Sequence, residues 1–144
     1  IKIFHQCRKS QIDKLKLAYS DSVNCELFDF KKNIAKLMLE ADIAITRSGS
    51  SAISEMVSLN LPFIAIPLPT SLDNHQYYNA KYFEERGFCW LVEQNFFNIY
   101  KFKKMIIDIV SNDREQLKRK LENMKTASKE NVLVKFENEI KEYF

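Results

Sequence analysis

An arginine, a glycine and three serines stand together in Arg47-Ser48-Gly49-Ser50-Ser51, where an apolar run ends and helical spacing begins. Gly49 can let the chain turn sharply and approach a ligand closely, and Ser50 or Ser51 can cap the helix. Free N–H groups at a helix start favour an anion such as a phosphate. Glu55, one turn further on, can accept sugar hydroxyls from the same ligand. An ordinary capped helix, with Arg47 paired to a neighbour, explains the same spacing.

A second polar cluster opens the next expected helix. Asn74, His75, Gln76 and Asn79 offer neutral donors and acceptors in one place, which suits a ligand rich in hydroxyl groups. His75, like His5 at the end of the first expected strand, is more often a capping or structural residue than a general base. No cluster of His, Cys and Asp has the spacing of metal ligands, so no metal site is predicted.

The elements that position these residues alternate along the chain. Strand-like runs are expected at 1–6, 23–28, 42–46, 62–66 and 88–92, and helices at 10–20, 33–41, 50–59 and 74–86, the last ending at a C′ glycine, Gly87. Such alternation implies right-handed crossovers and a parallel sheet covered on both faces, with ligands at the carboxyl ends of its strands.

A helical tail is expected after residue 97, with helices at 98–111, 113–128 and 130–143 and a break at Asn112-Asp113. The predicted fold class is therefore α/β, a Rossmann-like parallel sheet with flanking helices and a helical C-terminal tail. Residues 99–110 and 132–144 mix basic and large apolar side chains. Such faces suit an anionic membrane or a partner domain, although packing on the parent sheet explains the same pattern.

Length and composition narrow the function classes. With 144 residues, 46% of them hydrophobic, the chain is expected to be one globular domain with a real core. Its 22 basic and 19 acidic residues are spread along the chain, which argues against a nucleic-acid partner. Three cysteines without C-x-x-C spacing suit reduced thiols in a cytosol, and no apolar run is long enough to span a bilayer.

Several ordered motifs carry a family resemblance. Residues 41–87, ADIAITRSGSSAISEMVSLNLPFIAIPLPTSLDNHQYYNAKYFEERG, contain A-D-x-x-I-x-R-[SA]-G-x-x-x-x-S-E, then L-P-x-x-x-[IV]-P, then H-Q-x-x-N-A. IFHQCRK at 3–9 and FKKNIAKLMLEAD at 30–42 precede them. In this order they resemble the carboxyl-terminal, donor-binding domain of MurG-like glycosyltransferases of family 28, over about residues 1–95 and more weakly through the tail.

The resemblance implies a fold, an activity and a place in the cell. The chain would be the C-terminal half of a GT-B enzyme, a single nucleotide-sugar-binding domain over 1–144 with an α/β core at 1–95 and a tail at 96–144. The family moves GlcNAc from UDP-GlcNAc to undecaprenyl-diphospho-muramoyl-peptide in peptidoglycan synthesis, a cell-wall pathway tied to cell division. That work takes place in the cytoplasm, at the inner face of the bacterial plasma membrane, where peripheral membrane association is expected.

The resemblance also implies substrate contacts. The turn at 47–49 and the helix start at 51–52 would lie against UDP, Glu55 would bind the ribose, and Phe30 with the backbone of Lys31 would border the uracil. His75 and Gln76 would contact GlcNAc, with Asn79 supporting their helix. No catalytic residue, cofactor or metal is implied. The implied substrate-binding set is Phe30, Lys31, Arg47, Ser48, Gly49, Ser51, Ala52, Glu55, His75, Gln76 and Asn79.

The departures from the family limit the expected activity. The chain starts in a strand-like run at Ile1 and lacks the family's G-G-S-x-G-A loop and acceptor-binding N-terminal domain, so we expect the remainder of something longer. Ala52 stands where a Thr is usual, which weakens any side-chain contact there. Alone, the chain is expected to bind donor at most weakly and to transfer nothing. Three hypotheses stay open: a donor half working with an acceptor half, a separately encoded donor subunit of another polyprenyl-linked glycosyltransferase, and a non-catalytic remnant.

Overall fold

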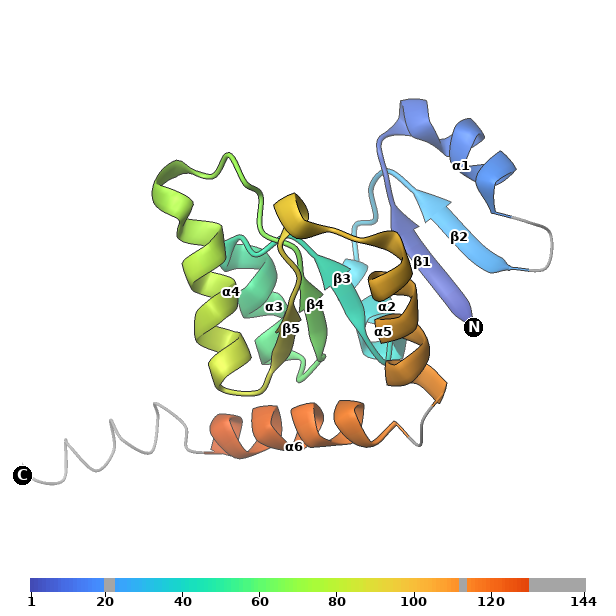
Figure 1. Cartoon of the computed structure of the whole chain (residues 1–144). Coiled ribbons are helices and arrows are strands. Elements are labelled where there is room, and N and C mark those ends of the chain that lie inside the picture. Colours follow the sequence, from blue (N-terminus) through green and yellow to red (C-terminus); the bar gives the residue numbers. More distant parts are fainter. Residues whose placement is uncertain (20–22, 112–113, 130–144) are drawn as a thin grey trace, which may run out of the picture. The chain divides into compact units, whose positions relative to one another are not determined.

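The computed structural model describes residues 1–19, 23–111 and 114–129 (Figure 1). The chain forms two compact units, Ile1–Glu40 and Ala41–Phe144. Each unit is described by itself below. The prediction of a single domain divided near residue 95 stays a prediction, and the expected helix at 130–143 and the break at 112–113 lie outside the described residues.

The first unit is a β-α-β-α arrangement. Strand β1 (Lys2–Gln6) pairs in parallel with β2 (Asn24–Phe28), and His5 stands opposite Leu27. The crossover runs through a short 3₁₀ turn, η1 (Lys9–Gln11), and α1 (Ile12–Ala18), and α2 (Ile34–Glu40) follows β2. His5 Nδ1 lies 3.0 Å from the Tyr19 hydroxyl, and this contact ties the end of α1 to β1.

The second unit contains three parallel strands in the order β3 (Ala44–Thr46), β4 (Phe63–Ala65) and β5 (Cys89–Leu91). Helix α3 (Ser50–Ser58) connects the first two strands, and α4 (His75–Glu85), preceded by the 3₁₀ turn η2 (Leu72–Asn74), connects the second pair. All three residues of β4 are fully buried. A central parallel strand is covered on both faces, which explains its unbroken apolar sequence.

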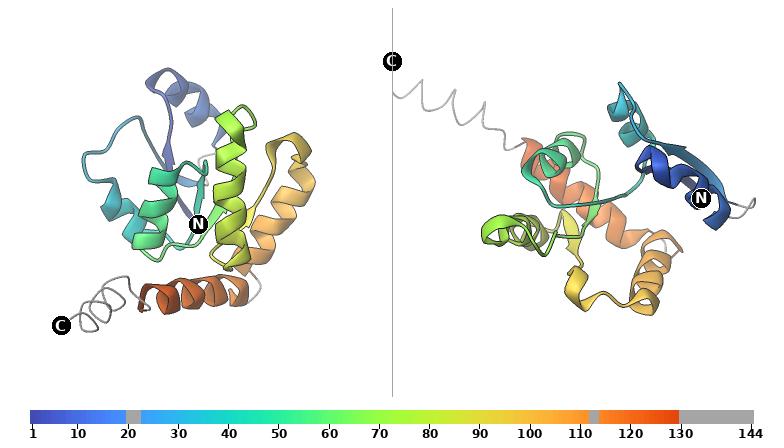
Figure 2. Two further views of the ribbon diagram at one scale, coloured as in Figure 1. Left: turned by 90° about the vertical axis from the view of Figure 1, so that its left-hand side faces the viewer. Right: turned by 90° about the horizontal axis from the view of Figure 1, so that it is seen from above.

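Helices cover both faces of this sheet. Ile64 packs with Ile109 of α5 (Ile99–Ser111) and Leu117 of α6 (Glu115–Lys129), so α5 lies on the Ile64 face. A further 3₁₀ turn, η3 (Gln94–Phe96), leads from β5 toward α5. Phe63 and Ala65 alternate to the other face, where α3 and α4 lie (Figure 2).

Helix α6 closes one end of the second unit. Its Lys120 Nζ donates to the Cys89 carbonyl at 2.6 Å, and its Asn123 Nδ2 donates to the Gly87 carbonyl at 3.4 Å. Both carbonyls belong to the amino-terminal end of β5 or the turn before it, so α6 runs across that end (Figure 1). The loops after the strands lie at the opposite, carboxyl end, where ligands bind in open parallel sheets.

Two helices of this unit end in the same way. At the end of α3, the N–H of Asn60 bonds to Val57 O at 3.0 Å and the N–H of Leu61 bonds to Met56 O at 2.9 Å. This pair of bonds is a Schellman motif, and Asn60 adopts the left-handed φ of 50° that it needs. Helix α4 ends likewise at Gly87, with φ of 72°, which confirms the predicted C′ glycine.

The α/β fold class is confirmed. Each observed strand lies inside its predicted run, and the described helices match their predicted ranges to within two residues at each end. The strands form two parallel sheets, β1-β2 and β3-β4-β5, where one sheet was expected. Each sheet belongs to a different compact unit, because β1 and β2 precede residue 41 and the other strands follow it.

Candidate functional site

The amino-terminal end of α3 carries backbone donors without a side-chain cap. Gly49 is the N-cap, and its carbonyl accepts the first helical hydrogen bond from Ile53 N at 3.0 Å, without a side-chain capping bond. The prediction that Ser50 or Ser51 caps α3 is therefore wrong, because both residues already lie within the helix. The first-turn N–H groups have no intrahelical acceptor. This end of α3 can therefore bind an anionic group.

Ser48 stands directly before this turn and is fully buried. Its Oγ has no hydrogen-bond partner among the described residues. Buried hydroxyl groups normally have a partner, since leaving one unpaired costs about 1–3 kcal/mol. Within the described part of the chain, Ser48 therefore adds a polar atom without a partner next to the first turn of α3.

Gly49 does not make the sharp turn predicted for it. Its φ of −65° and ψ of 146° are extended values that any residue adopts. A Cβ built on Gly49 would meet no atom within 4 Å. Neither the backbone nor the packing of the described chain requires glycine at this position. The remaining reason for a glycine, close approach of a ligand, stays a prediction.

Arg47 braces two loops. Its Nη1 donates to Ile66 O at 3.1 Å and to Pro67 O at 3.2 Å. These carbonyls follow β4, whereas Arg47 follows β3, so one guanidinium holds together the loops after two neighbouring strands. The alternative explanation was that Arg47 pairs with a neighbour, and the structure shows that its partners are two backbone carbonyls.

Helix α4 is tied to the same two loops. Asn79 Nδ2 donates to Ser48 O at 3.1 Å, in the loop after β3. Gln76 Oε1 accepts from Leu68 N at 3.0 Å, in the loop after β4. Together with Arg47, these side chains fix the start of α3 and the start of α4 at the carboxyl end of the sheet.

His75 begins α4 and makes a local hydrogen bond. Its Nδ1 lies 2.8 Å from the Leu72 carbonyl. A carbonyl oxygen only accepts, so Nδ1 carries the proton, and in the neutral ring Nε2 keeps its lone pair. The helix starts later than predicted because Asp73 and Asn74 both have left-handed φ values, 50° and 52°. A left-handed residue cannot continue a right-handed helix.

The remaining predicted contacts in the second unit lie on the first turns of α3. Ser51 and Glu55 are four residues apart on the helix, so they share one exposed face. Ala52 is half-buried beside them. The structure thus brings together at one end of this unit the residues Arg47, Ser48, Gly49, Ser51, Ala52, Glu55, His75, Gln76 and Asn79.

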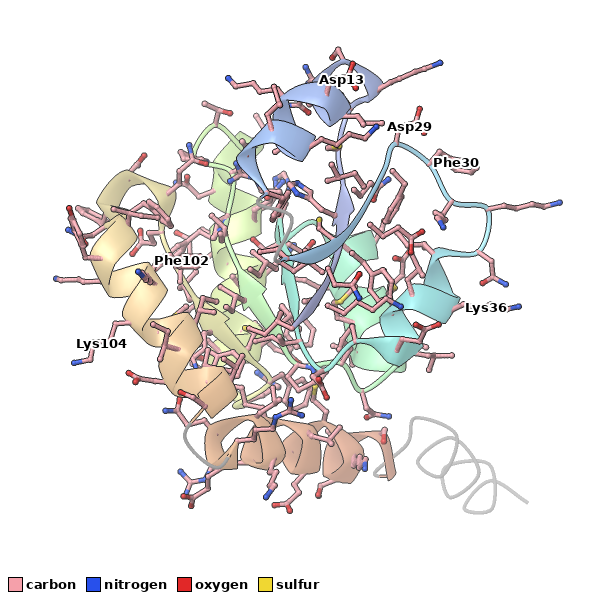
Figure 3. The ribbon with its side chains drawn as sticks, turned by 90° about the vertical axis from the view of Figure 1, so that its right-hand side faces the viewer. Asp13, Asp29, Phe30, Lys36, Phe102 and Lys104 are labelled. Carbon is pink, nitrogen blue, oxygen red and sulfur yellow. The ribbon has the colours of Figure 1, made fainter. Side chains whose placement is uncertain are left out.

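Phe30 and Lys31 belong to the first unit, in the loop after β2. Phe30 is 75% exposed, and its N–H donates to Asp29 Oδ1 at 2.7 Å. Figure 3 labels its side chain, next to Asp29. The Lys31 ammonium forms an ion pair with Glu26. Both residues therefore follow the carboxyl end of a parallel strand, as the second-unit residues do.

Two features were not predicted from the sequence. One is the set of backbone carbonyls that accept hydrogen bonds from Arg47 and Asn79. The other is a cavity of about 410 Å³ on another side of α4. No residue type signals which carbonyl a guanidinium will meet. The cavity had a weak signal, since Tyr77, Lys81 and Glu84 recur at helical spacing. Glu84 already accepts from Lys81 Nζ at 3.1 Å and Leu91 N at 3.3 Å. This hollow holds none of the predicted site residues.

Three further observations concern metal ions, the membrane and the cysteines. Within residues 1–19, 23–111 and 114–129, no group of three or more His, Cys, Asp or Glu is placed to hold a metal ion. Across the same ranges, no helix is both long enough and apolar enough to cross a membrane. The cysteines Cys7, Cys25 and Cys89 are free thiols.

Comparison with known proteins identifies the family. Residues 1–138 match the model described as the glycosyltransferase family 28 C-terminal domain. The chain belongs to this family. The match covers almost the whole chain, which confirms the predicted family 28 resemblance.

Curated relatives of this family 28 domain are similar over most of the chain. The UDP-N-acetylglucosamine--N-acetylmuramyl-(pentapeptide) pyrophosphoryl-undecaprenol N-acetylglucosamine transferase of Pelagibacter ubique (strain HTCC1062) is 36% identical over 133 residues, which is 92% of this chain and 37% of the relative. The protein of the same name from Campylobacter jejuni (strain RM1221) is 35% identical over 135 residues, covering 93% and 39%. The chain thus spans less than two fifths of these relatives and is homologous to their C-terminal domain.

Solved structures agree on the fold of the family 28 domain. The crystal structure of Acinetobacter baumannii MurG matches with a TM-score of 0.79 at 24% identity, covering 88% of this chain and 37% of that one. The glycotransferase of kitacinnamycin matches with a TM-score of 0.58 at 14% identity, covering 87% and 31%. These likenesses confirm the predicted C-terminal half of a GT-B fold.

Proposed function

We propose that this chain is the UDP-GlcNAc-binding half of a MurG-like hexosyltransferase that moves GlcNAc to undecaprenyl-diphospho-muramoyl-peptide. The names of its curated relatives supply the donor and the acceptor, and the family match supplies the half of the enzyme concerned. The acceptor would be bound by an N-terminal domain or a partner chain, at the inner face of the bacterial plasma membrane. Alone, the chain would bind donor weakly and transfer nothing.

One observation carries the proposal: the start of α3, which has no side-chain cap, is hydrogen-bonded to neighbouring elements at the carboxyl end of the sheet. Its first-turn N–H groups have no intrahelical acceptor, the Ser48 hydroxyl has no partner among the described residues, and Arg47 and Asn79 fix the loop that presents them. Backbone donors that are already oriented favour a diphosphate without further ordering. A charged diphosphate bound in this way would need no metal ion to neutralise it.

The side chains around this helix start suit the rest of a nucleotide sugar. Glu55 lies one helical turn from the start of α3, within reach of hydroxyls on a ribose joined to the diphosphate. His75 Nε2 offers an acceptor, and Gln76 keeps its amide donor because its Oε1 is already engaged. Phe30 belongs to the other unit, so its predicted contact with the base stays a prediction.

The direct test is a calorimetric titration of the folded chain with UDP-GlcNAc and with UDP-glucose. We expect saturable binding that prefers UDP-GlcNAc. Glu55→Gln should weaken it about tenfold or more, because a hydrogen bond to a charged group contributes about 1.5–3 kcal/mol. Glu122→Gln, on the exposed side of α6, is the matched control and should bind like the parent chain.

Each outcome has a meaning. Absence of UDP-GlcNAc binding by a chain that circular dichroism shows to be folded contradicts the proposal and favours a non-catalytic remnant. Equal binding of both sugars contradicts the assignment of GlcNAc. Transfer of GlcNAc to a lipid acceptor by this chain alone contradicts the need for a second half. A preference for the acceptor of another polyprenyl-linked pathway, once the partner is added, favours a separately encoded donor subunit.

A further inference from the structure

The cavity of about 410 Å³ lies between α4 and the start of α5, within the second unit. Its lining combines one face of α4, formed by Tyr77, Lys81 and Glu84, with the carboxyl end of β5, the turn η3 and the first turns of α5. Figure 2 shows α4 and α5 side by side in its left view. None of the predicted donor contacts lines this cavity. Its volume is in the range of sites that bind small molecules.

The half-buried part of the lining is mostly apolar. Leu91, Val92 and Met105 contribute aliphatic groups, and Phe102 contributes a ring. Phe97 extends this wall, because its ring centroid lies 5.1 Å from that of Phe102. Rings at such distances attract each other beyond the effect of the area that they bury, so a further ring gains by joining them. The cavity therefore suits a ligand that carries an aromatic group.

Two of the four charged side chains in the lining are already paired. Glu84 Oε2 accepts from Lys81 Nζ at 3.1 Å, and Glu84 Oε1 accepts from Leu91 N at 3.3 Å. Glu93 and Lys101 are the exposed charged residues of the lining, and neither forms an ion pair with another described residue. The cavity thus offers a ligand one carboxylate and one ammonium group.

These two charges favour a ligand that carries both signs. A ligand with only an anionic group would be repelled by Glu93, and one with only a cationic group would be repelled by Lys101. A zwitterion can place its ammonium group toward Glu93 and its carboxylate toward Lys101. We propose that this cavity binds a zwitterionic amino acid with an aromatic side chain, at a second ligand site separate from the predicted donor contacts.

Titration of the full chain with phenylalanine, followed by the NMR shifts of its backbone amides, tests the proposal. A ligand of about a dozen non-hydrogen atoms should bind with a Kd on the order of 1 mM. The amides that shift should be those of the cavity lining. Phenylpropionate lacks the ammonium group and phenethylamine lacks the carboxylate. Each should bind about fivefold more weakly than phenylalanine, because one exposed ion pair is lost.

Two single variants separate the roles of the two charges. Glu93→Gln should weaken phenylalanine and phenethylamine about fivefold and leave phenylpropionate binding as it is or stronger. Lys101→Gln should weaken phenylalanine and phenylpropionate by the same factor and spare phenethylamine. A general loss of structure cannot produce this crossed pattern, since it would weaken all three ligands. Glu122→Gln and Lys125→Gln, both exposed on α6, are the matched controls and should bind all three like the parent chain.

Three results would overturn the proposal. The first is the absence of saturable shifts when the folded parent chain is titrated with phenylalanine. The second is equal affinity for the three ligands, because the two charges would then select nothing. The third is a set of shifts confined to the start of α3, which would place the ligand at the predicted donor contacts instead. The titrations contain no UDP-GlcNAc, so their outcome does not depend on whether the chain binds donor.

Discussion

The two glycines of the chain differ in backbone conformation and in the space around them. Replacing each by alanine therefore tests whether glycine is required for ligand binding or for folding. Gly87 has a left-handed φ of 72°, and a Cβ there would lie 2.3 Å from Asn123 Nδ2. Gly49 has an extended backbone, and a Cβ there would meet no atom within 4 Å. We therefore expect Gly87→Ala to affect stability and Gly49→Ala to affect donor binding.

The magnitudes follow from these geometries. At Gly87, a left-handed alanine costs about 1–2 kcal/mol, and the Asn123 amide must also move, so the melting temperature should fall by about 5 °C. At Gly49, alanine restricts the unfolded chain and should raise stability by about 0.4–1 kcal/mol. The added methyl group would hold a diphosphate away from the first-turn N–H groups of α3. Loss of one charge-assisted hydrogen bond there would weaken UDP-GlcNAc binding about tenfold or more.

Stability is measured by thermal unfolding, monitored with circular dichroism. Donor affinity is measured on the same samples by calorimetric titration. The expected pattern is crossed: Gly49→Ala is as stable as the parent or more so and binds poorly, whereas Gly87→Ala is less stable and binds normally below its transition. A fall in stability for Gly49→Ala as large as that for Gly87→Ala would show that the chain itself needs glycine at position 49. Unchanged affinity in Gly49→Ala would show that the start of α3 does not contact the donor.

Two further predictions concern the brace and a buried thiol. Arg47→Gln removes donors to Ile66 O and Pro67 O, and should lower the free energy of unfolding by about 1 kcal/mol and donor affinity severalfold, in urea titration and calorimetry. Arg119→Gln on α6 is its control, and equal effects of both would contradict a specific brace. Burial raises the pKa of Cys89 to about 12 from its ordinary 9, so the folded chain keeps a proton that the unfolded chain releases. This group's contribution to stability should therefore fall by about 1.4 kcal/mol per pH unit above about pH 9, and Cys89→Ala should lose that slope in urea titrations at successive pH values. Burial lowers the pKa of Lys120 from its ordinary 10.5, so this group's contribution to stability rises with pH below about 10.5, in the parent chain and in Cys89→Ala alike. An unchanged slope in Cys89→Ala would refute the prediction for Cys89.

The elements were predictable because each has a strong local signal. The run Pro62-Phe63-Ile64-Ala65-Ile66 reads as a strand buried on both faces, and β4 is such a strand. Gly87 predicts a helix end, and it adopts the left-handed conformation that a C′ residue requires. The left-handed Asn60 at the end of α3 is the same device with a less obvious residue, which sequence reasoning passed over.

The details of the candidate site were less predictable, because residue type does not reveal which partner a polar group finds. Serines follow Gly49, so a side-chain cap was a reasonable expectation, yet the glycine itself is the N-cap. Arg47 has the charge to contact a diphosphate, yet its Nη1 meets two carbonyls from a loop about 20 residues away. Such partners depend on how neighbouring loops are placed by the sheet, which local sequence does not encode.

The braces also decide what the site can offer a sugar. Gln76 and His75 can each be both a donor and an acceptor in isolation, so their types alone leave the pattern open. In the structure, Gln76 Oε1 accepts a hydrogen bond from Leu68 N, and His75 Nδ1 donates one to the Leu72 carbonyl. Gln76 is thereby left as a donor and neutral His75 as an acceptor. A sugar hydroxyl both donates and accepts, so neighbouring groups of fixed and opposite polarity select hydroxyl-bearing ligands over ligands that can only donate or only accept.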